Sequence, residues 1–216
     1  MKLPKRLDEI QKLIEDNVIV IDVGCDHALL DIYLTLNRDN VKCIACDINE
    51  NALNGGILNI KKHHLEAKIK TKLGSGIEVI TNDINTLIIS GMGTNTICNI
   101  LTSPKLKQIN KIIVESNNDY YELRKFITSI GFYISYEEVI YDNNKYYINI
   151  VFLRGFKKYS KKELIYGPIL MKGNFDYYKY LYDKNISILN NIPKNKIITR
   201  FNIIKENLFL KKLIKK

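Results

Sequence analysis

The sequence predicts an alternating α/β domain with an additional pair of helices at its C-terminal end. Short apolar runs, each with the length of a buried strand, alternate with helical segments as far as residue 131. Two longer β-type runs follow, and after residue 160 only helical periodicity is present. Strands that alternate with helices favour a mostly parallel sheet covered on both faces.

The alternating part begins with an apolar strand at 18–24 that runs directly into a helix at 27–38. The later elements are a strand at 41–46, a helix at 51–65, strands at 68–73 and 86–90, a helix at 94–101, a strand at 111–115 and a helix at 119–130. Gly131 follows the last of these helices, in the position where glycine commonly ends one.

The two longer β-type runs, 132–141 and 146–153, are separated by Asp142-Asn143-Asn144-Lys145, which is suited to a hairpin turn. A parallel sheet that finishes in an antiparallel hairpin has the topology of class I methyltransferases, which a plain dinucleotide-binding fold does not share. We therefore expect residues 1–159 to form a class I, Rossmann-like methyltransferase domain with a mostly parallel seven-stranded sheet.

The C-terminal region, 160–216, is expected to form an antiparallel helical hairpin that resembles a short coiled coil. Its helices, at 172–190 and 196–215, are separated by Ile192-Pro193. Apolar residues recur along the second helix at coiled-coil spacing, which predicts that they form its seam with the first helix. The predicted seam consists of Ile197, Phe201, Ile204 and Leu208 on the second helix and Tyr178, Leu181, Tyr182 and Leu189 on the first.

Positive charge is concentrated in this C-terminal region. Residues 160–216 contain 13 Lys/Arg and 4 Asp/Glu, a net charge of +9, whereas the preceding residues carry only +1. Charge gathered on one segment is typical of a polyanion binder, which favours nucleic acid as a partner. The alternative is a compositional bias, because the chain is rich in Lys, Asn and Ile throughout.

The composition predicts a cytoplasmic protein without a metal. No apolar run approaches the roughly 20 residues of a membrane span, and MKLPKRLDEI has no apolar signal core. The four cysteines lie in apolar contexts that suit a reducing compartment. Cys43 and Cys46 lack the two further ligands of a zinc site. The oligomeric state stays open, a monomer included.

A cofactor site is predicted where the first two strands end. Gly24 lets the backbone approach a ligand, and the following helix offers free amides. Asp26 stands where such loops usually carry a second glycine, which is unfavourable for a pyrophosphate and acceptable for a cationic sulfonium. Asp47 follows Gly24 by 23 positions, close to the spacing of about 20 for a ribose-binding carboxylate. These features favour S-adenosylmethionine, although Asp47 could instead be a helix N-cap.

Four segments together resemble the bacterial tRNA (adenine-22-N1)-methyltransferase family. They are IDVGCDHALLDIYL, ISGMGTNTICNIL, VESNNDYYELRKFI and EEVIYDNNKYYINIVF, and LPKRLDEI and Tyr166-Gly167-Pro168 match further family motifs. The resemblance covers almost the whole chain in order. It implies methyl transfer from S-adenosylmethionine to N1 of one adenosine in the D-arm region of tRNA.

Site residues follow from the matched positions and from the strand ends. The predicted cofactor-binding residues are Asp22, Gly24, Asp26, His27, Asp47, Ile48, Ser75, Gly91, Met92 and Gly93. Asp26 and Asn117 are the predicted catalytic residues, since each could hydrogen-bond the adenine; for both, a helix N-cap is the alternative. Tyr120 and Tyr121 follow, and an aromatic residue here could stack on the base or pack beneath its loop.

Three positions depart from the family pattern. Ser116 replaces a proline, Thr94 replaces a glycine at a predicted helix N-cap, and Ser75 replaces an acid that commonly meets the adenine amino group. These departures keep open a non-catalytic RNA-binding protein on a methyltransferase fold. A small-molecule methyltransferase is a further alternative, which the basic C-terminal region disfavours.

Overall fold

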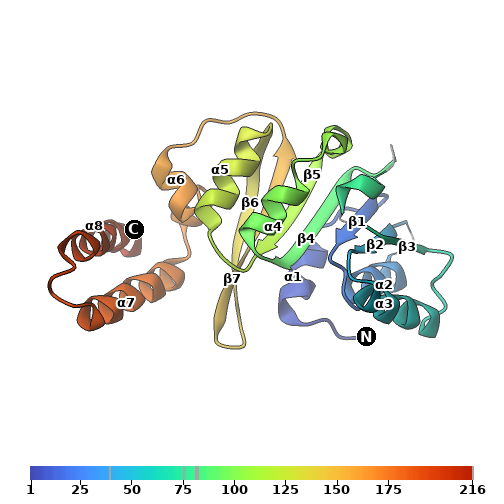
Figure 1. Cartoon of the computed structure of the whole chain (residues 1–216), viewed down its shortest axis with the longest axis horizontal. Coiled ribbons are helices and arrows are strands. Elements are labelled where there is room, and N and C mark those ends of the chain that lie inside the picture. The colour runs from blue at the N-terminus through green and yellow to red at the C-terminus, as the bar shows by residue number, and fades with distance from the viewer. Residues whose placement is uncertain (39, 75, 81–82, 216) are drawn as a thin grey trace. The chain divides into compact units, whose positions relative to one another are not determined.

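A computed structural model describes the chain except residues 39, 75, 81–82 and 216 (Figure 1). It divides into two compact units, Met1–Ile165 and Tyr166–Lys216. The predicted boundary at 159/160 lies earlier, because α6 (Lys161–Tyr166) begins within the first unit. There the buried guanidinium of Arg124 donates to the carbonyls of Leu164 and Ile165, at 3.1 and 3.2 Å.

The described residues of the first unit form a seven-stranded sheet in the order β3-β2-β1-β4-β5-β7-β6. The first five strands in this order are parallel to one another. Strand β7 is antiparallel to both β5 and β6, in agreement with the hairpin predicted from the sequence. The strands are β1 (Ile19–Val23), β2 (Lys42–Asp47), β3 (Ile69–Leu73), β4 (Thr86–Met92), β5 (Lys111–Ser116), β6 (Phe132–Asp142) and β7 (Lys145–Arg154). The class I methyltransferase fold is therefore confirmed.

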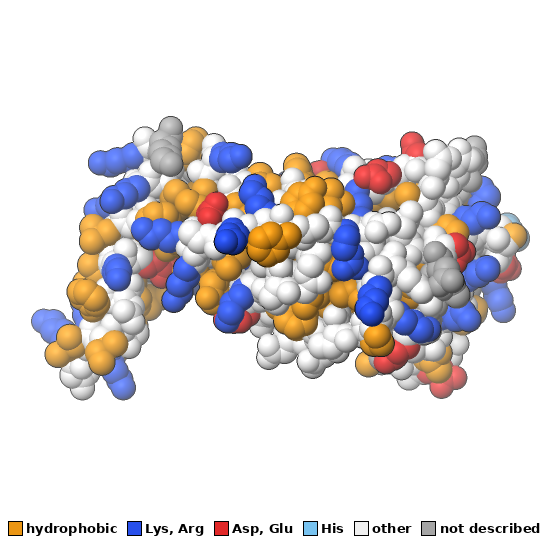
Figure 2. Space-filling view, turned by 90° about the horizontal axis from the view of Figure 1, so that it is seen from above, with side chains coloured by type: hydrophobic (Ala, Val, Ile, Leu, Met, Phe, Trp, Pro, Cys, Tyr) orange, Lys and Arg blue, Asp and Glu red, His pale blue; other side chains and the backbone are white. Residues whose placement is uncertain are grey.

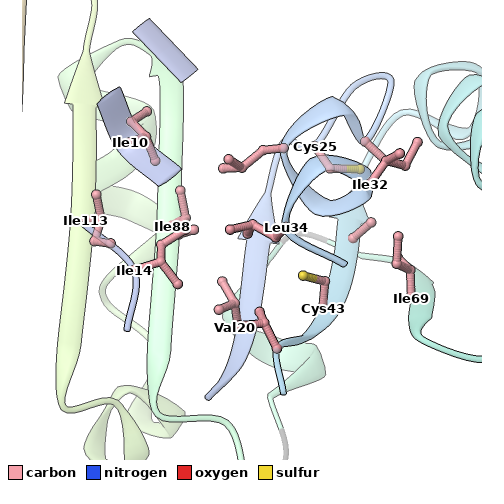
Figure 3. Close-up of a cluster of buried hydrophobic side chains, with 14 of the residues drawn as sticks. Ile10, Ile14, Val20, Cys25, Ile32, Leu34, Cys43, Ile69, Ile88 and Ile113 are labelled. Atoms are coloured by element: carbon pink, nitrogen blue, oxygen red, sulfur yellow. The ribbon is translucent and has the colours of Figure 1, made fainter. Parts of the chain in front are cut away.

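Helices cover both faces of this sheet (Figure 1). One face packs against α1 (Lys5–Lys12), α2 (Leu29–Asn37) and α3 (Glu50–Lys62), and the other is covered by α4 (Thr94–Ile100) and α5 (Tyr120–Ser129). Figure 3 shows Ile10 of α1 beside Ile88 and Ile113 of the central strands. Successive side chains of a strand point to opposite faces of the sheet, so one continuous apolar run provides buried residues beneath the helices on both faces.

Two turns have the backbone that their sequences predict. Asn143 and Asn144 both have positive φ, 48° and 61°, and Asp142 pairs with Lys145, so β6 and β7 join through a two-residue turn. Gly131, with φ 91°, follows the end of α5. Both are left-handed conformations, which Asn and Gly tolerate better than other residues do.

The second unit is a helical hairpin of α7 (Phe175–Asn191) and α8 (Ile197–Ile214), as predicted. The predicted stripe on α7 is buried or half-buried, with Tyr178 at 0% exposure. The predicted stripe on α8 is wrong, because its four residues are all exposed, from 47% for Ile204 to 72% for Ile197.

The face of α8 that is buried in the hairpin is instead displaced by one residue from the predicted stripe, with Asn207 in place of Leu208. Leu210 and Leu213 are buried, and Asn207 accepts a hydrogen bond from Asn185 of α7 at 3.1 Å. Arg200 donates to the carbonyls of Leu189 and Ile192 and closes the end of the hairpin. A polar pair thus takes part in the seam one residue away from Leu208, which apolar spacing had placed there.

Figure 2 shows lysine and apolar side chains side by side on this unit, at the left of the view. Over the part of the chain that the structure describes, no helix is both long and apolar enough to cross a membrane.

Candidate active site

A pocket of about 670 Å³ opens at the carboxyl ends of β1, β2 and β4. Here the strand order reverses, between β1 and β4, and such crevices are the usual ligand sites of open α/β sheets. Its volume lies in the range of small-molecule and cofactor sites. Of the predicted cofactor residues, Gly24, Asp47, Ile48 and Met92 line it.

Gly24 cannot be replaced by a larger residue without local rearrangement. Its φ is +77°, and a Cβ atom there would lie 2.1 Å from Cε of Met92. Its N–H donates to the carbonyl of Cys46 at 2.8 Å, which joins the turn after β1 to the end of β2. The absence of a side chain at Gly24 therefore leaves room for the Met92 side chain to approach the turn after β1.

Asp47 faces the pocket from the end of β2. One carboxylate oxygen accepts from the N–H of Asn49 at 2.8 Å, and the other lies 3.4 Å from the N–H of Asp26. The N-cap alternative for Asp47 is wrong, because Asn49 caps α3 with its own side chain. Asp47 is thus held in place by backbone amides while its carboxylate borders the pocket.

Asp26 and His27 lie outside the pocket lining. The Asp26 side chain is 71% exposed, its φ is +49°, and its carboxylate lies 3.8 Å from the ring of His27. The cap alternative for Asp26 is wrong, since α2 begins at Leu29 with Ala28 as its N-cap residue. The His27 ring extends towards Gly55 on α3.

Asp22, also a predicted cofactor residue, is buried behind the turn and does not line the pocket. Burial raises the pKa of Asp22 to about 7, and the charge of Asp47 also raises it, whereas the neighbouring Asp31 carboxyl group lowers it. Burial and the charge of Asp22 raise the pKa of Asp31 well above its usual range. Two adjacent buried carboxyl groups favour sharing a proton.

The ends of β4 and β5 form a second edge beside the pocket. Gly91, with φ +76°, lies at an irregularity in the β4–β5 pairing. The Asn117 side chain donates to the Gly91 carbonyl at 2.7 Å, and its backbone N–H donates to the Met92 carbonyl at 2.9 Å. The cap alternative for Asn117 is wrong, because Asp119 caps α5.

Two of the three departures from the family pattern contact each other. The hydroxyl oxygens of Thr94 and Ser116 lie 2.9 Å apart, and the Thr94 hydroxyl donates to the Asn118 carbonyl at 2.6 Å. Thr94 is not the cap of α4, which is Gly93. The pair joins the start of α4 to the loop that carries Asn117. Ser75, the third departure, lies outside the described residues.

Tyr120 packs beneath this loop. Its hydroxyl donates to the Ser116 carbonyl at 2.7 Å and accepts from the N–H of Ile148 at 3.2 Å, and its ring lies 5.7 Å from the guanidinium carbon of Arg124. These contacts occupy the polar end of the side chain, so the packing alternative holds for Tyr120.

The far wall of the pocket comes from residues that the sequence patterns did not identify. Two short 3-10 helices, η1 (Ile77–Val79) and η2 (Pro104–Gln108), supply part of it, and Lys105 donates to the carbonyls of Glu78 and Ile80 between them. The wall comprises Ile77, Glu78, Thr96, Asn99, Ile100, Thr102, Ser103, Pro104 and Lys105. These residues follow no motif, because only the chain's return to the same edge brings them to the pocket.

The described residues contain no cluster of three or more His, Cys, Asp or Glu with the geometry of a metal site. Cys43 and Cys46 are buried free thiols, and burial raises the pKa of Cys46 to about 11.

The sequence is similar to those of known methyltransferases, which agrees with the cofactor pocket described above. Residues 3–150 match the family model described as a methyltransferase domain. The chain is 28% identical over 150 residues to the tRNA (adenine(22)-N(1))-methyltransferase of Bacillus subtilis, an alignment that covers 68% of this chain and 63% of the relative. It is 30% identical over 176 residues to a Mycoplasma genitalium protein named as a putative tRNA methyltransferase, covering 78% of this chain and 79% of the relative.

A solved structure resembles the whole chain. M. capricolum TrmK in complex with S-adenosyl-homocysteine superimposes with a TM-score of 0.83 at 29% sequence identity, and the match covers 100% of this chain and 99% of that one. The chain therefore belongs to the methyltransferase domain family and, within it, to the bacterial tRNA (adenine(22)-N1)-methyltransferase family.

Proposed function

We propose that this protein transfers the methyl group of S-adenosylmethionine to N1 of an adenosine in tRNA, at position 22 by its family. The observation that carries the proposal is the pairing of two edges. A pocket bordered by Gly24 and Asp47 adjoins a second edge on which Asn117 is held against Gly91. The first edge suits the cofactor, and the second suits the acceptor base.

The residues of the pocket fit S-adenosylmethionine. Gly24 lets the Met92 side chain approach the turn after β1, and both residues line the pocket. Asp47 suits the ribose hydroxyls, and Ile48, Ile77 and Ile100 suit the adenine ring. Gly91 and Gly93 position Met92 at the pocket rather than line it.

The chemistry asks the protein mainly to position its substrates. S-adenosylmethionine, when bound, supplies a methyl group that is already activated on a sulfonium. Adenine N1 carries a lone pair, so no strong base is needed to begin, and alignment of N1 with the methyl carbon dominates catalysis. Asn117 Oδ1 has no hydrogen-bond partner among the described residues and can accept from the adenine amino group. The base must be held out of its stack to reach this edge.

Asp26 follows Gly24 in the turn after β1, and its exposed side chain is proposed to act on the incoming base. Asp26→Asn is expected to slow methyl transfer at saturating cofactor and to leave cofactor affinity unchanged, because Asp26 does not line the pocket. Single-turnover rates test this role. A wild-type rate would remove Asp26 from the catalytic residues.

The direct test is incubation with unmodified tRNA and labelled S-adenosylmethionine, followed by mapping of the methylated base. Label on N1 of adenosine 22 is the expected result. Cofactor binding without transfer to any tRNA would favour a non-catalytic RNA-binding protein. Methyl transfer to a small molecule and not to tRNA would favour a small-molecule methyltransferase. With tRNA as its substrate, the protein is proposed to act in the cytoplasm.

A further inference from the structure

Arg6 lies beside the proposed acceptor edge and belongs to no role described so far. Its Nη1 atom lies 2.7 Å from Oε2 of Glu115, the next-to-last residue of β5. The Glu115 side chain is 0% exposed and the Arg6 side chain is 33% exposed. A carboxylate buried to this extent at a strand end orients the guanidinium and leaves its outer part accessible.

The guanidinium borders the residues that the proposed reaction uses. A Cβ atom on Gly91 would lie 3.3 Å from Nη1 and 3.8 Å from Nη2 of Arg6. The carbonyl of the same Gly91 accepts the Asn117 amide, and the next residue, Met92, lines the pocket. Arg6 therefore lies beside Gly91, which contacts the proposed base-binding Asn117 and precedes Met92 of the pocket.

The remaining donors of Arg6 match a phosphate. Among the described residues, the hydrogen-bond partner of Arg6 is Glu115, which Nη1 contacts, so Nη2 and Nε stay available. A guanidinium presents such donors in a planar fork that fits phosphate oxygens in a bidentate manner.

Anchoring of α1 alone is the competing explanation, and the chain contains a matched example of it. Arg38 donates to the carbonyls of Ile14 and Gln11 just beyond and within α1, and it lies 3.6 Å from the carboxylate of Asp16. Arg38 follows the C-terminal end of α2, at the opposite edge of the sheet from the pocket. It thus shares the anchoring contacts of Arg6 without its place at the acceptor edge.

We propose that Arg6, oriented by Glu115, binds a backbone phosphate of the RNA next to the target adenosine. The inference rests on the proposed function, because it requires RNA at this edge.

The test compares two double variants of the full chain that keep the net charge unchanged. Arg6→Gln with Glu115→Gln removes the proposed phosphate ligand and avoids leaving a buried charge unpaired. Arg38→Gln with Asp16→Asn removes the matched anchor. Affinity for unmodified tRNA is measured as a function of salt concentration, with S-adenosylmethionine affinity by calorimetry as the check on folding.

Loss of one phosphate contact lowers the slope of log affinity against log salt by about 0.7–0.9. We expect this change, with affinity on the order of tenfold weaker, for the Arg6/Glu115 variant only. A folded Arg6/Glu115 variant with the wild-type slope would overturn the inference, as would an equal change in the Arg38/Asp16 variant.

A second measurement needs no protein variant. A tRNA fragment in which a single phosphate beside the target adenosine is replaced by a neutral methylphosphonate should bind the wild-type protein about tenfold more weakly at one of the two flanking positions. No loss at either position overturns the role of Arg6. If the wild-type protein neither binds nor methylates tRNA, the proposed function itself fails, which separates the two failures.

Discussion

At the scale of single residues, Asp47 is the most direct test of the cofactor site. Asp47→Ala should weaken S-adenosylmethionine binding by roughly 1.5–3 kcal/mol, because the carboxylate can accept both ribose hydroxyls as charged hydrogen bonds. Calorimetry measures the effect. Asn49→Ala is the control, since Asn49 lies two residues after Asp47 and caps α3 without lining the pocket. An equal loss in both variants would mean that the helix start, rather than the ribose contact, matters.

The buried pair Asp22 and Asp31 predicts a pH dependence of stability with a defined sign. A carboxyl group whose folded pKa is raised stabilises the fold while protonated, so its contribution is lost as the pH rises from about 4 to about 7. Asp31→Asn removes one carboxyl group and keeps a donor for Asp22. Its free energy of unfolding should exceed that of the wild type at pH 8, above the pKa of about 7 of Asp22.

Denaturant unfolding at pH 4, 6 and 8 measures this difference. The advantage of Asp31→Asn should be small at pH 4, where both carboxyl groups of the wild type hold protons. A constant difference at all three pH values would show that the substitution acts through packing and not through the titration of the pair.

At the scale of elements, the two turns that carry the acceptor edge depend on each other. Thr94 begins α4, Ser116 ends β5, and their hydroxyls form one buried hydrogen bond that residues from either turn alone cannot make. The sequence departs from its family at both positions. The hydrogen bond joins the two positions across the loop.

A double-mutant cycle tests this coupling. Thr94→Val and Ser116→Ala should each destabilise the fold by about 1 kcal/mol, with a coupling energy on the order of 0.5–1.5 kcal/mol between them. Free energies of unfolding from urea titrations provide the four corners of the cycle. Simple additivity of the two substitutions would contradict a shared hydrogen bond.

At the scale of the whole molecule, the basic second unit is expected to supply much of the attraction for tRNA. Lys194, Lys196, Lys205 and Lys212 are exposed on it. Their joint replacement by Gln should weaken tRNA binding and flatten its salt dependence, since each lost phosphate contact lowers the slope by about 0.7–0.9. Cofactor affinity should not change.

The matched control neutralises four exposed lysines of the first unit, Lys42, Lys61, Lys62 and Lys70. They lie near the start of β2, at the end of α3 and in β3, away from the strand ends that form the site. An equal loss of slope in both variants would mean that the charge of the second unit is compositional.

The sequence by itself determined the α/β order, the terminal hairpin, the pocket edge at Gly24 and Asp47, and the family. Each of these depends on local chemistry: apolar runs form strands, glycine and asparagine permit left-handed turns, and successive parallel strands end at one edge. On α7 the predicted stripe contains Tyr178, the buried residue of that helix, and three half-buried residues.

Only the tertiary structure decided the rest. The α8 seam runs through Asn207 and Leu210, because the face that a helix buries is decided by the residues that pack against it. In this hairpin an Asn185–Asn207 hydrogen bond takes the place of an apolar contact. The far wall of the pocket, the Thr94–Ser116 pair and the Arg6–Glu115 pair join residues distant in sequence. No local pattern encodes such contacts, since they exist only after the strand ends and helices have been brought to one edge of the sheet.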